Sequence, residues 1–331
     1  MKITIIGSKG YDTLEYHISD SLKFLGHEVE IIDITDIIPV EYKYNYLLIK
    51  YLGRYDDYIF NKIANKVLET EPDLVIGTYR FINPNCIKKI KSNLINVPVI
   101  HINPDALTSF ERQQIFASPY DHYFTKDPYI VEFMVKKMNL NCHFLAEAFN
   151  PRVHKKIDID KNIIEEKINI DVMAFGSMYP YRYKMIKKLV DSGINVTIFG
   201  KQDRRYFSPE LQGIFRNEWI TGERKSELLF GSKLLFNNFH YAEVNSVNGK
   251  FFESAGVGAF QICDFRESIV DFSAIEPQKF TFKNIGEAVD LIKYYLNKPE
   301  ERAYLSNIQY QHFIANHTYE HRIIQILNTV I

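Results

Sequence analysis

Short runs of aliphatic and β-branched residues alternate with amphipathic helical patterns along the whole chain. The expected strands cover residues 2–7, 29–34, 73–77, 97–102 and 122–125 in the first half, and 171–175, 195–200, 218–222, 233–239 and 259–264 in the second. The expected helices lie at 13–25, 41–70, 128–138, 182–190 and 225–230, with a short helix after Asn248 and a helical tail from Asn284. Strands that alternate with helices in this way form parallel sheets. The pattern therefore predicts an α/β chain made of two similar halves.

The length of 331 residues is enough for about two domains, each with its own core. The first half ends at Asn150-Pro151, and the charged stretch 155–167 that follows contains little that would anchor a sheet. We predict a first domain at 1–152, a second at 153–316, and a C-terminal helix at 317–331 that packs back toward the first domain. Because open α/β sheets bind ligands beyond the carboxyl ends of their strands, we expect the two domains to face each other across a ligand-binding cleft.

The charges of the chain are balanced, with 40 Lys and Arg residues against 41 Asp and Glu residues and a net charge of -1. No overall field therefore favours nucleic acid or an anionic membrane. Cys86, Cys142 and Cys263 are too far apart for a zinc or redox motif, which fits a reducing compartment. The opening residues 1–7 are too short for a signal peptide, and no run of about 18 apolar residues occurs. We therefore expect a cytoplasmic protein without a transmembrane segment.

Residues 245–262 combine a turn, a short helix and a buried strand. Asn248-Gly249 marks a helix start, and Lys250 and Glu253 then lie three residues apart on one helix face. The amino end of a helix presents free N–H groups and the positive end of the helix dipole, and so binds phosphate. Lys250 adds a cation there, and the carboxylate of Glu253 accepts hydrogen bonds from a diol such as that of ribose. The segment therefore predicts a sugar-nucleotide pocket.

Several motifs of the second half are typical of one family in their order and spacing. They are FGSMYPYR at 175–182, VTIFG at 196–200, LFNNFH at 235–240, NGKFFESAG at 248–256, IKYYLNKPEER at 292–302 and HTYEHR at 317–322. Over about residues 118–331 the chain resembles the CgeB-like (spore maturation protein) glycosyltransferases, within the class that has the GT-B fold. The first half matches more loosely, at 71–77, 101–105, 120–125 and 144–154. The resemblance implies a GT-B-like fold of two Rossmann-like parallel-sheet domains, with the acceptor bound by 1–152 and the nucleotide-sugar donor by 153–316.

The resemblance also implies which residues form the site. The implied donor-binding residues are Gly176, Ser177, Gly200, Lys201, Trp219, Ile220, Asn245, Asn248, Gly249 and Glu253. Arg182 and Lys250 are the expected catalytic groups, because they would stabilise the departing diphosphate. The structural alternatives are an ion pair with an acidic neighbour for Arg182 and an ordinary surface lysine for Lys250. For Glu253 the alternative is a solvent-exposed helix glutamate, and for Trp219 it is core packing.

Two acidic positions bear on the mechanism. Retaining members of this fold often carry two glutamates separated by seven residues, of which the first contacts the sugar and the second the ribose. Here the second position is Glu253, but the first holds Asn245, which keeps hydrogen-bonding capacity and lacks the charge. Glu243 is a nearby carboxylate. Asp105 follows a strand of the first half and is the expected acceptor-side base or orienting residue.

No metal site is predicted. The Asp158-Ile-Asp160 sequence has the spacing of metal-dependent transferases of another fold, but it lies in the predicted linker. His317 and His321 are four residues apart, and a structural helix explains them better than a metal. Residues 42–58, which are rich in Tyr and Lys, would form an acceptor-binding or membrane-surface face, or, as their core-like periodicity favours, an ordinary packed element.

Together these features predict a metal-independent, retaining glycosyltransferase without a cofactor, which moves a sugar from a nucleotide-diphosphate sugar to a hydroxyl-bearing acceptor. The expected partners are the donor and a glycan, protein or lipid-linked acceptor of the cell envelope, with no nucleic acid and with peripheral membrane contact left open. Two alternatives remain: a sugar-nucleotide epimerase or hydrolase on the same fold, and a non-catalytic nucleotide-sugar-binding subunit of a glycosylation complex. The sequence does not define the nucleotide, the sugar, the acceptor or the oligomeric state.

Overall fold

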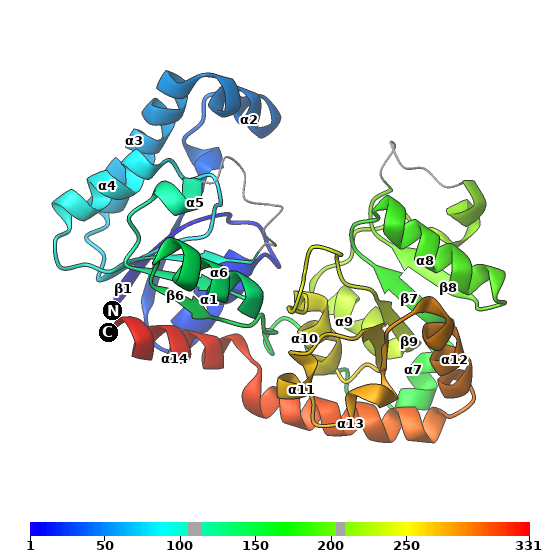
Figure 1. Cartoon of the computed structure of the whole chain (residues 1–331). Helices are drawn as coiled ribbons and strands as arrows, with labels where there is room; N and C mark the ends of the chain where they lie inside the picture. The colour runs from blue at the N-terminus through cyan, green and yellow to red at the C-terminus, as the bar shows by residue number, and fades with distance from the viewer. Residues whose placement is uncertain (105–113, 203–208) are drawn as a thin grey trace. The chain divides into compact units, whose positions relative to one another are not determined.

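Two compact units, each built around a parallel sheet, make up the computed structural model, which describes residues 1–104, 114–202 and 209–331 (Figure 1). Unit 1 contains Met1–Glu147, Ala242–Ser246 and Tyr319–Ile331, and unit 2 contains Ala148–Tyr241 and Val247–Thr318. The predicted α/β fold with two Rossmann-like parallel sheets is confirmed, with six strands in the first sheet and five in the second.

The sheet of unit 1 has the strand order β2-β1-β3-β4-β5-β6, and all neighbouring strands are parallel. Its strands are β1 (Lys2–Ile6), β2 (Glu28–Ile32), β3 (Leu74–Gly77), β4 (Val99–Asn103), β5 (His122–Thr125) and β6 (Cys142–Phe144). Its helices are α1 (Leu14–Phe24), α2 (Tyr42–Tyr51), α3 (Gly53–Glu69), α4 (Pro84–Asn93), α5 (Gln114–Ala117), α6 (Pro128–Met138) and α14 (Tyr319–Val330), with a short 3-10 helix at Ile34–Asp36. The strands β3 and β4 are buried throughout, as expected where helices cover both faces of a parallel sheet. The last helix of the chain, α14, contacts α1 within this unit (Figure 1).

The sheet of unit 2 has the order β11-β10-β9-β7-β8, again with parallel neighbours. Its strands are β7 (Ile170–Phe175), β8 (Val196–Phe199), β9 (Ser232–Asn237), β10 (Gln261–Asp264) and β11 (Thr281–Phe282). Its helices are α7 (Lys161–Ile168), α8 (Pro180–Asp191), α9 (Gly222–Gly231), α10 (Gly249–Gly256), α11 (Ile269–Phe272), α12 (Ile285–Leu296) and α13 (Pro299–Asn316), with 3-10 helices at Pro209–Ile214 and Pro277–Lys279.

The strand order of unit 2 reverses direction at β7. The chain first places β8 on one side of β7 and then crosses to place β9 on the other side. The loops that follow the neighbouring strands β7 and β9 therefore run in opposite directions. Open α/β sheets bind ligands in the crevice between two such loops, at the carboxyl ends of the strands. In unit 2 that position lies beyond Phe175 and Asn237, the last residues of β7 and β9.

Several details differ from the sequence predictions. The helix expected at 41–70 is two helices, because Leu52 between them has an extended backbone with φ -118° and ψ 90°. No strand forms at 218–222; instead Phe215 forms an isolated parallel bridge with Ile198 at the edge of the sheet. The expected linker contains α7, and Asp160 is the residue that caps it: its carboxylate accepts hydrogen bonds from the N–H groups of the next turn. A structural role therefore accounts for Asp160.

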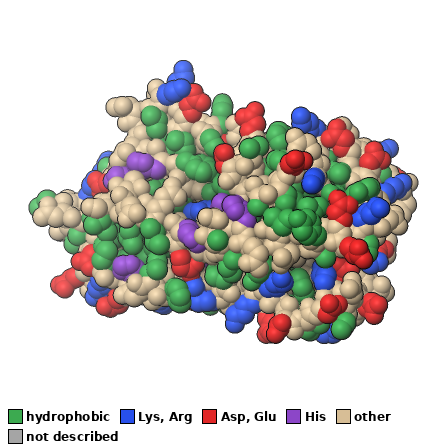
Figure 2. Space-filling view, turned by 90° about the horizontal axis from the view of Figure 1, so that it is seen from below, with side chains coloured by type: hydrophobic (Ala, Val, Ile, Leu, Met, Phe, Trp, Pro, Cys, Tyr) green, Lys and Arg blue, Asp and Glu red, His purple; other side chains and the backbone are tan. Residues whose placement is uncertain are grey.

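Charged side chains of both signs are interspersed over the face shown in Figure 2, in keeping with the balanced composition. Among the described residues, none of the helices combines the length and the apolar character that crossing a bilayer requires.

The tight packing of α10 in unit 2 gives a stability prediction. A Cβ atom on Gly256 would overlap the ring of Phe149, which is fully buried and has no room to withdraw. We expect Gly256→Ala to lower the free energy of unfolding by about 1–3 kcal/mol, because the strain of overpacking outweighs the helix-forming advantage of alanine. Urea denaturation followed by circular dichroism measures this.

Gly213→Ala is the matched control, because a Cβ atom there meets no atom within 4 Å. We expect it to leave stability nearly unchanged. Equal stabilities of the two variants would contradict the packing argument.

Candidate functional site

The amino end of α10 is held in place by buried amide side chains. Asn248 caps the helix, and its Oδ1 atom accepts a hydrogen bond of 3.1 Å from the N–H of Phe251. The amides of Asn248 and Asn237 exchange two hydrogen bonds of 3.1 and 3.2 Å, and Asn237 also donates to Gln261 over 3.2 Å. Gln261 in turn donates to the carbonyl of Phe251 at 2.8 Å. The network ties the start of α10 to the neighbouring strands β9 and β10.

The hydrophobic side of α10 determines which residues are available at its surface. Phe251 and Phe252 are fully buried, and both rings contact Phe313 and Phe272. The alternation of buried and half-buried residues leaves the predicted pair, Lys250 and Glu253, outside this aromatic core.

Two glycines bring the ends of β7 and β8 unusually close together. Gly176 and Gly200 have φ values of 98° and 146°, which favour glycine, and a Cβ atom on Gly200 would overlap the carbonyl oxygen of Gly176. Gly176 also leaves space for cations: the Nζ atom of Lys250 lies 2.9 Å, and Nη1 of Arg182 3.8 Å, from the place where a Cβ atom of Gly176 would stand. The structure thus brings Gly176, Gly200, Arg182 and Lys250 together.

Arg182 is the most unusual residue of this group. Its side chain is buried, with 2% exposure, and Nη1 donates a hydrogen bond of 3.2 Å to the carbonyl of Ser177. Within the described part of the chain, its Nε and Nη2 atoms have no hydrogen-bond partner and it forms no salt bridge. Burial lowers the pKa of Arg182 to about 10, so the group remains charged at neutral pH. Since a buried charge without a partner is costly, the site is suited to receive an anion.

A cavity of about 690 Å³ opens beside these residues, at the carboxyl ends of the strands of unit 2. It is lined by Ser177, Met178, Tyr179, Pro180, Tyr181, Lys201, Gln202, Trp219, His240 and Tyr241. These residues come from the loops after β7, β8 and β9, from the start of α8 and from the segment before α9, which lie at the carboxyl ends of the strands. The indole of Trp219 is 56% exposed, whereas the adjacent Ile220 is buried in the core and presents no side chain to the cavity.

Glu253 has a lysine and a histidine as neighbours within unit 2. One carboxylate oxygen lies 3.3 Å from Nζ of Lys225, and the other lies 3.7 Å from Nε2 of His154. Its side chain is only 16% exposed, so it is not the solvent-exposed glutamate of the structural alternative. It does not line the 690 Å³ cavity. Lys225 is buried and was not predicted, because nothing distinguishes this lysine from the many others in the sequence.

Two of the acidic or amide positions discussed above belong to unit 1. Asn245 belongs to unit 1, where its N–H and that of Val244 donate to the carboxylate of Asp127 at 3.3 and 3.0 Å. Glu243 also lies in unit 1 and forms an ion pair of 2.6 Å with Lys126. Asp105 lies outside the described residues.

The state of Arg182 leads to a second prediction. Folding lowers the pKa of Arg182 to about 10, so above that pH the unfolded chain binds more protons than the folded chain. The free energy of unfolding therefore rises only as the pH increases above about 10. Below pH 10 the folded chain bears the full cost of burying the charged guanidinium. We therefore expect Arg182→Met to raise the free energy of unfolding of the ligand-free chain by about 1–3 kcal/mol.

Lys184→Met on the exposed side of the same helix is the control, with an expected change within about 0.5 kcal/mol. A clear loss of stability in Arg182→Met, measured by urea denaturation, would show that the guanidinium is compensated in the folded chain.

Comparisons with known proteins place these features in context. Residues 182–328 match a family described as Glycosyl transferase-like. The spore protein CgeB of Bacillus subtilis (strain 168) is 21% identical over 197 residues, which cover 54% of this chain. The match spans 58% of the length of CgeB, less than two thirds of that protein.

Solved structures agree in fold over nearly the whole chain. Sucrose-phosphate synthase from Thermosynechococcus elongatus superposes with a TM-score of 0.71 at 9% identity, covering 99% of this chain and 98% of that one. HepE of Anabaena, solved in complex with UDP and glucose, gives a TM-score of 0.66 at 12% identity, with coverages of 99% and 100%. The lipopolysaccharide outer core galactosyltransferase WaaB gives 0.63 at 13% identity, with full coverage of both chains. The chain is thus a distant homologue of the CgeB spore protein, with a glycosyl transferase-like domain in its second half and the fold of the GT-B glycosyltransferases.

Proposed function

We propose that the chain transfers a sugar from a nucleotide-diphosphate sugar to a hydroxyl group of a glycan, protein or lipid-linked acceptor. The observation that carries the proposal is the buried guanidinium of Arg182, whose Nε and Nη2 have no partner among the described residues, beside a cavity at the carboxyl ends of parallel strands. A diphosphate supplies the missing acceptors and the missing negative charge. Residues 153–316 would be the donor domain, 1–152 the acceptor domain, and 317–331 a helix associated with the latter.

The chemistry requires stabilisation of negative charge. As the bond between the anomeric carbon and the diphosphate oxygen breaks, charge develops on the leaving group, and the acceptor oxygen forms the new bond as its hydroxyl loses a proton. Arg182, Lys250 and the amino end of α10 supply positive charge around Gly176, where their positions are already fixed before the reaction. Because these groups neutralise the diphosphate, we propose a metal-independent reaction that needs no cofactor.

The remaining donor contacts follow from the cavity. We propose that the nucleotide base stacks on Trp219, whose exposed indole offers a flat surface. The diphosphate and its sugar would contact the backbone around Gly176, Ser177, Gly200 and Lys201. Ile220 would contribute only through its main chain, because its side chain is buried. The short helix start at Asn248-Gly249 completes the phosphate end.

Glu253 is assigned to the ribose hydroxyl groups. A carboxylate accepts several hydrogen bonds at once, so the contact of Glu253 with Lys225 is compatible with hydrogen bonds from a diol. Lys225 then acts as a positioning residue that orients the carboxylate. We propose retention of configuration, with Asn245 at the position of the sugar-contacting glutamate and Asp105 orienting the acceptor hydroxyl.

The central test is transfer itself. With labelled UDP-, GDP- and TDP-sugars and a cell-envelope extract, we expect label to appear in an acceptor for at least one donor. Arg182→Lys should lower the rate about 100-fold, because lysine keeps the charge but not the planar fork that binds two oxygens.

Lys188→Met, which removes an exposed cation from the same helix, should leave the rate unchanged. Tight nucleotide binding without transfer would favour a non-catalytic subunit. A changed sugar in the absence of any acceptor, detected by NMR, would favour an epimerase. Equal rates for wild type and Arg182→Lys would remove Arg182 from the mechanism.

The assignment of Glu253 gives a separate prediction about affinity. The wild-type chain should bind a nucleoside diphosphate about 10-fold more tightly than its 2′-deoxy analogue, since the lost hydrogen bond is to a charged group. Glu253→Gln should bind the two ligands nearly equally. Calorimetry with both ligands measures this ratio, and an unchanged preference in the variant would show that Glu253 does not contact the ribose.

A further inference from the structure

Helix α2 of unit 1 is almost entirely exposed, although its sequence is rich in large apolar and aromatic residues. Only two of its residues, Asn45 and Ile49, are buried. The exposed large side chains of α2 and the residue that follows it are Tyr42, Tyr44, Tyr46, Leu47, Tyr51 and Leu52. Exposed apolar groups gathered on one short element are uncommon in a monomer and mark an interaction surface.

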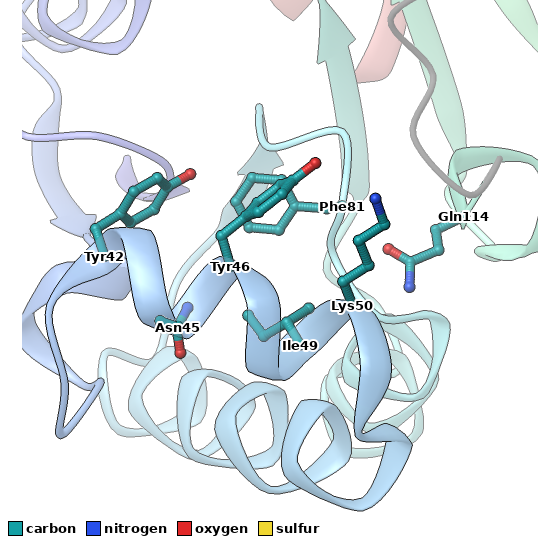
Figure 3. A pocket seen from close by; sticks show the side chains of 7 residues that line it. All are labelled: Tyr42, Asn45, Tyr46, Ile49, Lys50, Phe81 and Gln114. Atoms are coloured by element: carbon teal, nitrogen blue, oxygen red, sulfur yellow. The ribbon is translucent and has the colours of Figure 1, made fainter.

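The way in which α2 is attached fixes which side faces outward. Ile49 belongs to the core of unit 1, and Oδ1 of Asn45 accepts a hydrogen bond of 2.9 Å from the hydroxyl of Tyr55 in α3. Figure 3 shows Tyr42, Tyr46 and Lys50 extending from another side of α2, near Phe81. The helical period places the residues opposite Asn45 and Ile49 on a single outward face, which we call the α2 face: Lys43, Tyr44, Leu47 and Tyr51, with Lys50 at its edge toward Phe81.

The α2 face combines apolar and basic side chains. From Tyr42 to Tyr55 the chain contains three basic residues, Lys43, Lys50 and Arg54, and no acidic residue. The ammonium groups of Lys43 and Lys50 lie 4.6 and 5.6 Å from the ring centres of Tyr44 and Tyr51. Lys43 also pairs with Glu41 at 2.9 Å, but both side chains of this pair are more than 60% exposed, so the pair is weak.

From this arrangement we infer that the α2 face docks on the surface of an anionic lipid bilayer. Leucine and tyrosine side chains insert at the level of the lipid headgroups, where the aromatic ring is in an apolar layer and the hydroxyl reaches water. Lysine side chains beside them extend their ammonium groups to the lipid phosphates. The docking is peripheral, because α2 is a helix of 10 residues and too short to cross a bilayer.

A lipid surface fits the α2 face better than a protein partner does. Lysine is depleted in the cores of protein interfaces, yet here Lys43 and Lys50 stand among the apolar side chains of the same face. The slot between α2, Phe81 and Gln114 does not offer a rival site for a sugar, because its volume of about 10 Å³ holds no more than one water molecule. This inference does not depend on the proposed transferase activity.

Co-sedimentation of the full chain with lipid vesicles tests the inference. We expect binding to vesicles of equal parts phosphatidylcholine and phosphatidylglycerol, and at least about 10-fold weaker partitioning to phosphatidylcholine alone. The double variant Leu47→Asp with Tyr51→Asp should reduce partitioning to the anionic vesicles by about 10-fold or more, since it removes apolar contact and adds like charge. Lys50→Glu should reduce partitioning to the anionic vesicles less than the double variant does, and it should weaken the preference for anionic over neutral vesicles.

Ile163→Asp in α7 of unit 2 is the control, because it places one aspartate at another exposed apolar position of a helix. Its partitioning should equal that of the wild type, and melting curves should show that all variants fold. Absence of wild-type binding, equal binding to both kinds of vesicle, or equal binding by the double variant would overturn the inference. Sedimentation as a dimer that the double variant dissociates would assign the α2 face to a second copy of the chain instead.

Discussion

The crossing of the chain from one side of β7 to the other is the constraint on which the site of unit 2 depends. With β8 on one flank and β9 on the other, the loops that leave β7 and β9 diverge, and neither fills the space between them. Gly176 lets the main chain turn away directly at the end of β7, and the amides of Asn237 and Asn248 hold the amino end of α10 on the β9 side. The cavity is therefore a consequence of topology, which a few side chains then make polar.

Arg182 shows how this arrangement relates stability to ligand binding. Its buried guanidinium donates one hydrogen bond to a main-chain carbonyl. This bond does not offset the loss of hydration around its other nitrogen atoms. A buried residue that costs stability and has hydrogen-bond donors already oriented is preorganised for an anion, because little reorganisation is needed when an anion binds. Lys250, which approaches the same glycine, adds a second positive charge there. The electrostatic cost of burying Arg182 and the proposed affinity for a diphosphate therefore have the same origin.

The sequence allowed most of the strands, the fold class and the position of the helix start to be predicted, because each depends on local pattern; the strand expected at 218–222 does not form, and β6 and β11 were not predicted. Asn248 followed by glycine is a local cap, and it does begin α10. Contacts made across long sequence distances could not be read in this way. The ion pair of Lys225 with Glu253 joins two different helices, α9 and α10, and the burial of Arg182 depends on how α8 packs. Ile220 illustrates the limit: it adjoins Trp219 in the sequence, yet one side chain enters the core while the other lines the cavity.

The exposure of α2 could not be predicted from the sequence for a different reason: both the composition and the periodicity favoured a packed element. The net charge of -1 averages over the whole chain, so it conceals a segment whose charges are all basic. Closely spaced Leu47, Leu48 and Ile49 have the density of a packed helix, but one helix buries only one stripe, and here Ile49 takes the core position and leaves Leu47 outside. The break at Leu52 has a further consequence: it separates α2 from α3, so α2 is not required to continue the direction along which α3 packs. A helix attached by two buried residues and free to present its opposite side is suited to contact an extended surface, whereas a continuous helix over 41–70 would have turned part of that side toward the core.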